Sequence, residues 1–212
     1  MKIQNVALVL ASLSICSRGA AAQTCDLDHY RWPEKTSTAL LGSAAQPVSI
    51  AAMLNWRVPP IGRGMAFRCA ARVPAERRVL TVVGWVRRVD RTKDDGDWHI
   101  ELTERRRDRV GACIVVEIPP AEIHPVFRAA RASLDSVLQR TRLNRHGDLA
   151  QPIQLRITGA AFYDGEHLGK KGQIRPHGRC NSSASALWEI HPVYRIEPAT
   201  ARDAQYNNPL RK

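Results

Sequence analysis

The sequence has no apolar run long enough for a membrane-spanning helix, which needs about 20 residues. The longest such run, residues 6–15, follows Lys2 and precedes the small residues Ala20–Ala22. A basic start, a short apolar segment and an A-x-A site are typical of a secretory signal peptide. We therefore expect removal of residues 1–22 by cleavage near Ala22, no membrane span, and a periplasmic or secreted protein of 190 residues.

Acidic residues are scarce, with 20 Asp and Glu against 32 Lys and Arg. Loss of Lys2 and Arg18 with the signal peptide lowers the net charge by two, from +12 to +10. Such an excess favours anionic partners, including nucleic acid and other polyanions. An arginine-rich genomic composition would give the same charge without any such partner.

Closely spaced cysteines are also missing, which argues against a zinc site built from cysteine pairs. The four cysteines beyond residue 22 form an even set in an exported chain, so we expect disulfides. Three pairings are possible, and the sequence alone does not choose among them. Their places along the chain favour Cys25–Cys69, within the N-terminal segment, and Cys113–Cys180.

Two catalytic motifs are absent as well. There is no G-x-S-x-G, and no glycine-rich phosphate loop follows a strand. A serine-type nucleophile therefore has little support. The turn at residues 164–167 (DGEH) has metal-ligand residue types, but so short a polar turn is a weak signal.

Strand patterns dominate the chain after residue 78. They occupy residues 79–89, 97–103, 112–118, 153–163 and 187–196. An apolar stripe from Ile123 to Leu138 predicts one helix, with Pro125 in its first turn and Gly147 as its stop. The order β-β-β-α-β-β predicts a mainly β protein with one long helix, a five-stranded OB-fold-like barrel. Another small barrel and an α+β sandwich are the alternatives.

The rest of the chain is less regular. Residues 23–75 contain five prolines and three glycines, and they predict an irregular N-terminal arm with a short helix within residues 47–56. We assign residues 76–197 to the OB-fold-like domain. Residues 198–212 are expected to form a disordered tail.

Four motifs stand in one order along this domain: DGDWHI at residues 95–100, VEIP at 116–119, TGAAFYD at 158–164 and WEIHPV at 188–193. On these motifs, residues 76–196 resemble a family of bacterial exported proteins with an OB-like domain and no established activity. The resemblance implies a fold and the positions of the motifs, but no mechanism. The loop after Asp164 is longer and more basic than in that family, so nothing is carried over to residues 166–183.

Acids and histidines alternate with apolar residues in three of the strands, and alternate residues share a face. The polar positions are Asp97, His99, Glu101, Glu117, Glu189 and His191. We expect these faces to be neighbours, with the first strand lying against both the second and the fifth. Such a face can bind a divalent cation or activate water. The catalytic candidates are His99, Glu117, Glu189 and His191, and the metal candidates are Asp97, His99 and Glu117. A wet sheet face with cross-strand ion pairs is the alternative.

Basic residues gather in two predicted loops, which flank the usual ligand groove of an OB-fold. The candidate polyanion-binding residues are Arg87, Arg88, Lys93, Lys170, Lys171, Arg175 and Arg179. Binding of a phosphate backbone there would depend strongly on salt. A flexible solvated loop is the alternative.

These features lead to three functional hypotheses. The first is a binding module for nucleic acid or another polyanion. The second is a metal-dependent hydrolase of phosphodiesterase type, which uses the Glu and His face. The third is a structural subunit of the cell envelope that docks through its N-terminal arm.

Overall fold

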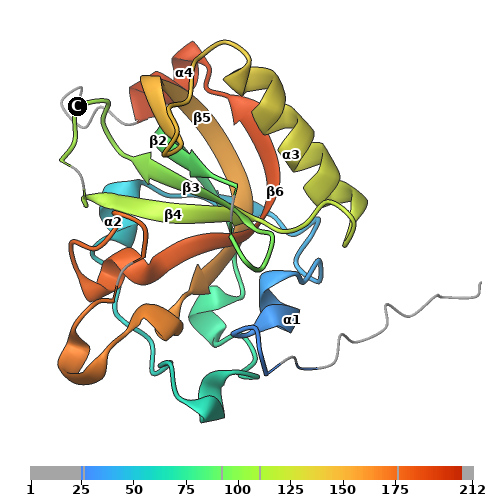
Figure 1. Ribbon diagram of the computed structural model, residues 1–212, viewed down its shortest axis with the longest axis vertical. Coiled ribbons are helices and arrows are strands. Elements are labelled where there is room, and N and C mark those ends of the chain that lie inside the picture. Colours follow the sequence, from blue (N-terminus) through green and yellow to red (C-terminus); the bar gives the residue numbers. More distant parts are fainter. Residues whose placement is uncertain (1–24, 26, 92, 110, 176, 207–212) are drawn as a thin grey trace, which may run out of the picture.

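Five strands close a barrel in this protein. The computed structural model describes residues 25, 27–91, 93–109, 111–175 and 177–206. The expected signal peptide, residues 1–22, lies outside the described residues. The strands follow the order β2-β3-β4-β6-β5, and β5 pairs back with β2. This is the mainly β, OB-like barrel with one long helix that the sequence predicts (Figure 1).

The barrel strands are β2 (Val79–Asp90), β3 (Trp98–Thr103), β4 (Cys113–Ile118), β5 (Asp148–Tyr163) and β6 (Trp188–Pro198). The β4–β6 pairing is parallel, and the other four barrel pairings are antiparallel. The first strand was expected to approach the fifth, and this was wrong. Instead β2 closes the barrel against β5, and β6 lies between β4 and β5.

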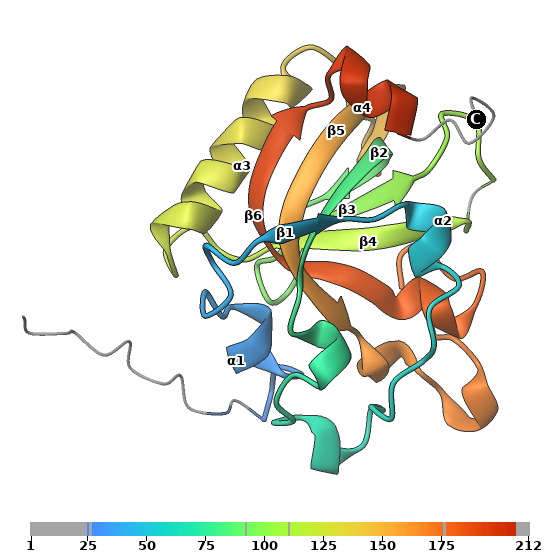
Figure 2. The same cartoon turned by 180° about the vertical axis from the view of Figure 1, so that it is seen from behind.

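The single long helix, α3 (Pro125–Leu138), connects β4 to β5 and packs along β6 (Figure 1). Pro125 occupies the first turn, as predicted. The helix ends well before Gly147, which instead lies in the turn that precedes β5. Figures 1 and 2 show this helix on the opposite side of the barrel from the loop that connects β5 to β6.

The barrel core follows the alternation of the strands. Ile100 and Ile114 face the core with Trp188 and Ile190, and all four are at most 1% exposed. The intervening polar residues point away from the core, as the period of a strand requires. They are nevertheless buried, so the wet sheet face that was the alternative interpretation is not observed.

The N-terminal arm is more ordered than its sequence indicates. It contains α1 (Trp32–Lys35), β1 (Ala45–Pro47) and α2 (Ile50–Met53), and β1 adds a parallel strand to the start of β2. Figure 2 shows β1 crossing the barrel between α1 and α2, after which the chain runs below the barrel and enters β2. Short 3-10 turns occupy Met65–Phe67, Pro74–Glu76, Gly165–His167, Lys170–Gly172 and Ala184–Leu187.

A buried ion pair fixes the arm to the barrel. The Arg31 guanidinium donates to both carboxylate oxygens of Glu76, at 2.8 and 2.7 Å. Glu76 also accepts the backbone N–H of Tyr163, at the end of β5, at 2.8 Å. A buried guanidinium is tolerated here because a bidentate carboxylate satisfies it.

The ends of the chain and the cysteines complete the fold. Residues Ala201–Tyr206 form the helix α4, whereas the sequence predicted a disordered tail from residue 198. Cys25 is bonded to Cys69 and Cys113 to Cys180, the pairing that their chain positions favoured. Disulfides fit a protein that folds in an oxidising compartment. Among the described residues, no helix has both the length and the apolar character to cross a membrane.

We predict that Gly159→Ala destabilises the barrel by about 1–3 kcal/mol, because the β5–β6 pairing leaves no room for a methyl group. A Cβ at Gly159 would lie 2.3 Å from the Pro192 carbonyl oxygen and 2.5 Å from Ile190 Cγ2. Urea denaturation measures the change. The control is Gly64→Ala, whose new methyl group would have no neighbour nearer than 3.9 Å. Equal midpoints for both variants would contradict the prediction.

Candidate functional site

The pairing of three strands brings the predicted polar residues together. His99 on β3 lies directly opposite Glu117 on β4. Because β4 runs parallel to β6 with Val115 beside Glu189, Glu117 falls beside His191. The outer face of β3, β4 and β6 therefore carries one continuous cluster of carboxylates and imidazoles.

Short distances connect the cluster. Glu117 lies between two histidines: its Oε1 is 2.8 Å from His99 Nδ1, and its Oε2 is 3.0 Å from His191 Nδ1. His191 also approaches Glu189 Oε2 at 3.4 Å through Nδ1 and Asp97 Oδ2 at 3.2 Å through Nε2. The four catalytic candidates and Asp97 thus converge, as the sequence predicted.

The loop between β5 and β6 covers this cluster. His177 Nε2 lies 2.5 Å from Glu189 Oε1, and Arg179 donates through Nε to Glu101 Oε2 at 2.9 Å. Gly178 sits between these two residues with φ +53°, and a Cβ there would lie 2.7 Å from His99 Nε2. Only a glycine fits a backbone that approaches the imidazole so closely in this conformation. The Cys113–Cys180 disulfide then ties the loop to β4.

The N-terminal arm covers the cluster with a lysine. Lys35, at the end of α1, is 6% exposed, and its Nζ lies 3.5 Å from Asp164 Oδ2. Burial opposes the charge, but Asp164, Glu117, Glu189 and Asp97 together hold the pKa of Lys35 well above its ordinary value. The cluster is therefore negative enough to keep an ammonium group charged in the interior.

Burial and neighbouring charges also have opposite effects on the pKa values of Glu117 and His191. Burial disfavours the Glu117 carboxylate, yet the hydrogen bonds from His191 and His99 hold its pKa well below the ordinary value. Burial also opposes a charge on His191, whose pKa is nevertheless raised well above the ordinary value by Asp97, Glu117 and Glu189. A proton on His191 therefore supplies part of the positive charge that these carboxylates require.

Some nitrogen and oxygen atoms of the cluster have no hydrogen-bond partner among the described residues. Among the described residues, both carboxylate oxygens of Asp97, Nε2 of His99 and His191, and Nδ1 of His177 are buried without one. The contact between His191 Nε2 and Asp97 has the distance of an ion pair but not the alignment of a hydrogen bond. Burial raises the pKa of the Asp97 carboxyl despite the nearby imidazole. Buried polar atoms without hydrogen bonds are costly, which makes the oxygens of Asp97 and the ring nitrogens of His177 and His191 candidates for ligation.

Two groups in this region have the spacing of metal ligands. One oxygen each of Asp97 and Glu117 and one nitrogen of His191 lie within 4.8 Å of one another. One ligand atom from each of Asp164, His167 and His177 also lies within 4.8 Å of the other two. Donors about 2.1 Å from a tetrahedral zinc ion lie roughly 3.4 Å apart, so the donors of either group would have to draw closer together around an ion.

His99, a predicted metal ligand, belongs to neither group. Its Nδ1 contacts Glu117, and a Cβ on Gly178 would lie 2.7 Å from its Nε2. It is placed to orient the Glu117 carboxylate, as partners behind metal ligands commonly are. A third group with ligand spacing, Glu101 with Cys113 and Cys180, is unsuitable because both sulfurs belong to a disulfide.

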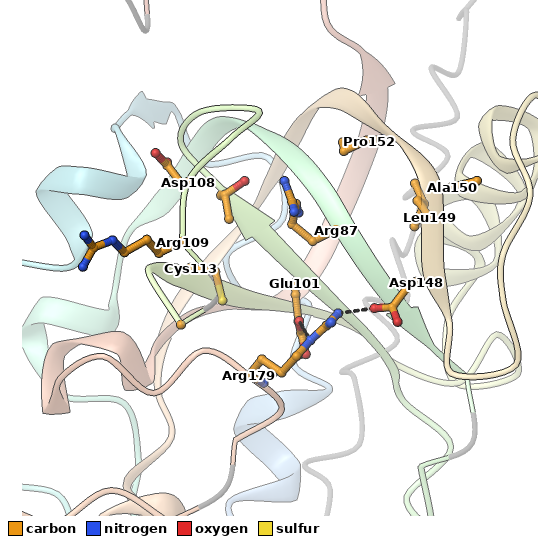
Figure 3. Close-up of a pocket in the computed structure, with 12 residues that line it drawn as sticks. Arg87, Glu101, Asp108, Arg109, Cys113, Asp148, Leu149, Ala150, Pro152 and Arg179 are labelled. Atoms are coloured by element: carbon orange, nitrogen blue, oxygen red, sulfur yellow. Dashed lines mark hydrogen bonds and ion pairs between the residues drawn. The ribbon is translucent and has the colours of Figure 1, made fainter.

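The predicted polyanion-binding residues do not form one basic groove. Arg87 and Arg179 line a cavity of about 260 Å³, but Glu101, Asp108 and Asp148 line it too (Figure 3). Arg179 is paired with Glu101 and with Asp148 Oδ1 at 2.5 Å. Arg88 and Lys93 also lie beside acids. Arg88 contacts Asp90 and Glu101, and Lys93 lines another cavity together with Asp94 and Asp95.

The remaining basic residues are exposed. Lys170, Lys171 and Arg175 lie on the loop between β5 and β6, outside the lining of either of these cavities. Arg87 and Arg179 therefore share a cavity, and these three residues do not line it.

Sequence reasoning missed four members of the buried site: Lys35, Asp164, His167 and His177. The turn at residues 164–167 carries a weak metal-ligand signal, whereas His177 stands in the sequence as a lone histidine within a basic loop. Lys35 gave no signal, because only the docking of the arm brings it to the barrel face.

A scan against protein-family models finds no match for the chain, and a search of curated proteins finds none either. What the site can do therefore follows from its donor atoms, their burial and their charges.

We predict that Glu117→Ala lowers the free energy of unfolding by about 3–5 kcal/mol in a chelator-containing buffer. The change leaves His99 and His191 buried beside no central carboxylate, and loss of one partner from a buried charged set is costly. Guanidinium denaturation measures the loss. The exposed Glu122→Ala is the control and should change stability by about 0.5 kcal/mol or less. A stable Glu117→Ala protein would show that charge pairing does not hold this face together.

Proposed function

We propose that the protein is an exported metal-binding protein, with Asp97, Glu117 and His191 as ligands of a divalent transition-metal ion. The observation that carries the proposal is the convergence of these three side chains in the interior, where both oxygens of Asp97 and Nε2 of His191 are buried without hydrogen bonds. A cation between them would replace the proton on His191 as the counter-charge of the carboxylates.

The donor set favours zinc or a similar ion over calcium and magnesium. Calcium takes six to eight oxygen ligands, and magnesium retains several waters. A buried group of two carboxylates and one imidazole has fewer oxygens and little room for water. Zinc accepts such mixed ligands in tetrahedral geometry, with one position left for a further donor or water.

A mainly acidic cavity lies next to Lys35, which borders the buried cluster. A hollow of about 310 Å³ is lined by Asp94, Asp95 and Glu166, with Lys35 also in its lining. Lys35 in turn contacts the buried cluster through Asp164. The acids would raise the local concentration of cations and disfavour a polyanionic substrate.

The closure of the site favours binding over hydrolysis. Asp97, Glu189 and His191 are 0% exposed, and Glu117 is 6% exposed. A hydrolase must bring a substrate and a water molecule to the metal, and the arm and loop cover this face. We therefore place the phosphodiesterase hypothesis below metal binding.

We expect the purified mature protein to bind zinc, and Glu117→Gln to lose the ion at the proposed site. His99→Gln should weaken binding there by about 10–100-fold, because it removes only the partner that orients Glu117. Competition with a chromogenic chelator measures the affinity, and elemental analysis after dialysis measures the content.

The matched control is His146→Gln, because His146 is exposed in the turn before β5. Asp97→Asn serves if Glu117→Gln does not fold. Wild-type protein without zinc, or both ligand variants with full zinc content and affinity, would refute the proposal.

A second candidate function, polyanion binding, is favoured by one segment. Lys170, Lys171 and Arg175 are exposed within six residues, and no ion pair involves them among the described residues. Solvated cations in one short loop can contact successive phosphates without a preformed groove.

We predict that Lys170→Ala/Lys171→Ala/Arg175→Ala weakens binding to duplex DNA and lowers the slope of log K against log salt by about 3, at roughly 0.9 per lost phosphate contact. Fluorescence anisotropy across a salt series measures both. The control is Arg140→Ala/Arg142→Ala/Arg145→Ala, which removes the same charge from exposed positions near the end of α3. Equal slopes for the two variants would exclude a specific role for the loop.

A further inference from the structure

Three side chains of the β5–β6 connection gather beside the proposed metal site. Asp164 follows the end of β5, His167 ends the next 3-10 turn, and His177 lies ten residues further on. His167 Nε2 lies 3.8 Å from Asp164 Oδ2, and the rings of His167 and His177 have centroids 4.6 Å apart. Together they offer one carboxylate and two imidazoles within 4.8 Å.

His177 has the environment of a metal ligand. It is 3% exposed, its Nδ1 has no hydrogen bond among the described residues, and its Nε2 contacts Glu189 Oε1. A histidine that binds a metal through one nitrogen usually bonds to a carboxylate through the other. The buried, unpaired Nδ1 is therefore the second observation, besides the clustering, that indicates a ligand.

Glu189 lies between this group and the first one. Its Oε1 contacts His177, and its Oε2 lies 3.4 Å from His191 Nδ1. Glu189 therefore contacts one histidine of each group through a separate oxygen, as carboxylates behind ligating histidines commonly do.

We propose that the β5–β6 loop supplies a second divalent-cation site, formed by Asp164, His167 and His177, and that Glu189 connects it to the first. The inference rests on the proposed function, since Glu189 would connect two sites only if the first one binds a metal. Lys35 now supplies positive charge to Asp164 at 3.5 Å, and a cation would take over that role.

The loop holds these ligands in place. Cys180 is bonded to Cys113 on β4, and Arg179 contacts Glu101 on β3 through its backbone N–H and its side chain. Both anchors lie within three residues of His177. His167 keeps a side chain that is 30% exposed, so a cation can reach the second site from solvent.

The test is the metal content of the full mature chain after equilibrium dialysis against zinc. We expect two zinc ions per chain in the wild type, one in His167→Gln and one in Glu117→Gln. The control His146→Gln should retain two. His167 is chosen because its partial exposure lets glutamine replace it without opening a buried cavity.

Glu189→Gln tests this connection by the affinities of the two sites. Because Glu189 contacts one histidine of each group, the change should weaken zinc binding at both sites by about 10–100-fold. An unchanged affinity at either site, measured by chelator competition, would overturn the role of Glu189.

The outcomes separate the two proposals. One zinc in the wild type that is lost in Glu117→Gln overturns the second site and leaves the first. Two zinc ions in both the wild type and His167→Gln overturn the assignment of the loop residues. No zinc in any form overturns both proposals.

Discussion

Ionised groups that leave water must find opposite charges or hydrogen bonds, and this requirement governs the outer face of β3, β4 and β6. The face carries carboxylates that most sheets would leave in solvent. Here Glu117 and Glu189 are instead enclosed with His191 between them. The arm and the β5–β6 loop bring partners for the buried acids: Lys35 contacts Asp164, and His177 contacts Glu189.

Protons and metal ions are alternative counter-charges for such a face. Without a metal, the raised pKa of His191 and the lowered pKa of Glu117 describe an imidazolium held among carboxylates. A divalent ion would release those protons and take the same place. Two contacts hold the covering elements in place: the Arg31–Glu76 pair and the Cys113–Cys180 disulfide. Neither includes a proposed metal ligand, so the arm and the β5–β6 loop are held on the barrel without an ion.

Much of the barrel could be predicted because strand periodicity is a local property. The pattern placed Trp188 and Ile190 in the core and Glu189 and His191 on the other face, and the structure has both. The pattern could not give the closure of β2 against β5, since strand order is decided by how twisted strands pack over distance. It also missed β1, because three residues without alternation carry no strand signal.

The sequence by itself determined which residues can meet on one face: the period of two aligns His99 with Glu101 and Glu189 with His191 whatever the strand order. It also determined that four cysteines and a basic loop follow the expected leader. Only the tertiary structure decided that the polar face is enclosed and that Arg179 forms ion pairs with Glu101 and Asp148. It also decided that Lys35, Asp164, His167 and His177 join the cluster. The reason is that burial and charge pairing depend on contacts between segments far apart in sequence, which local spacing does not encode.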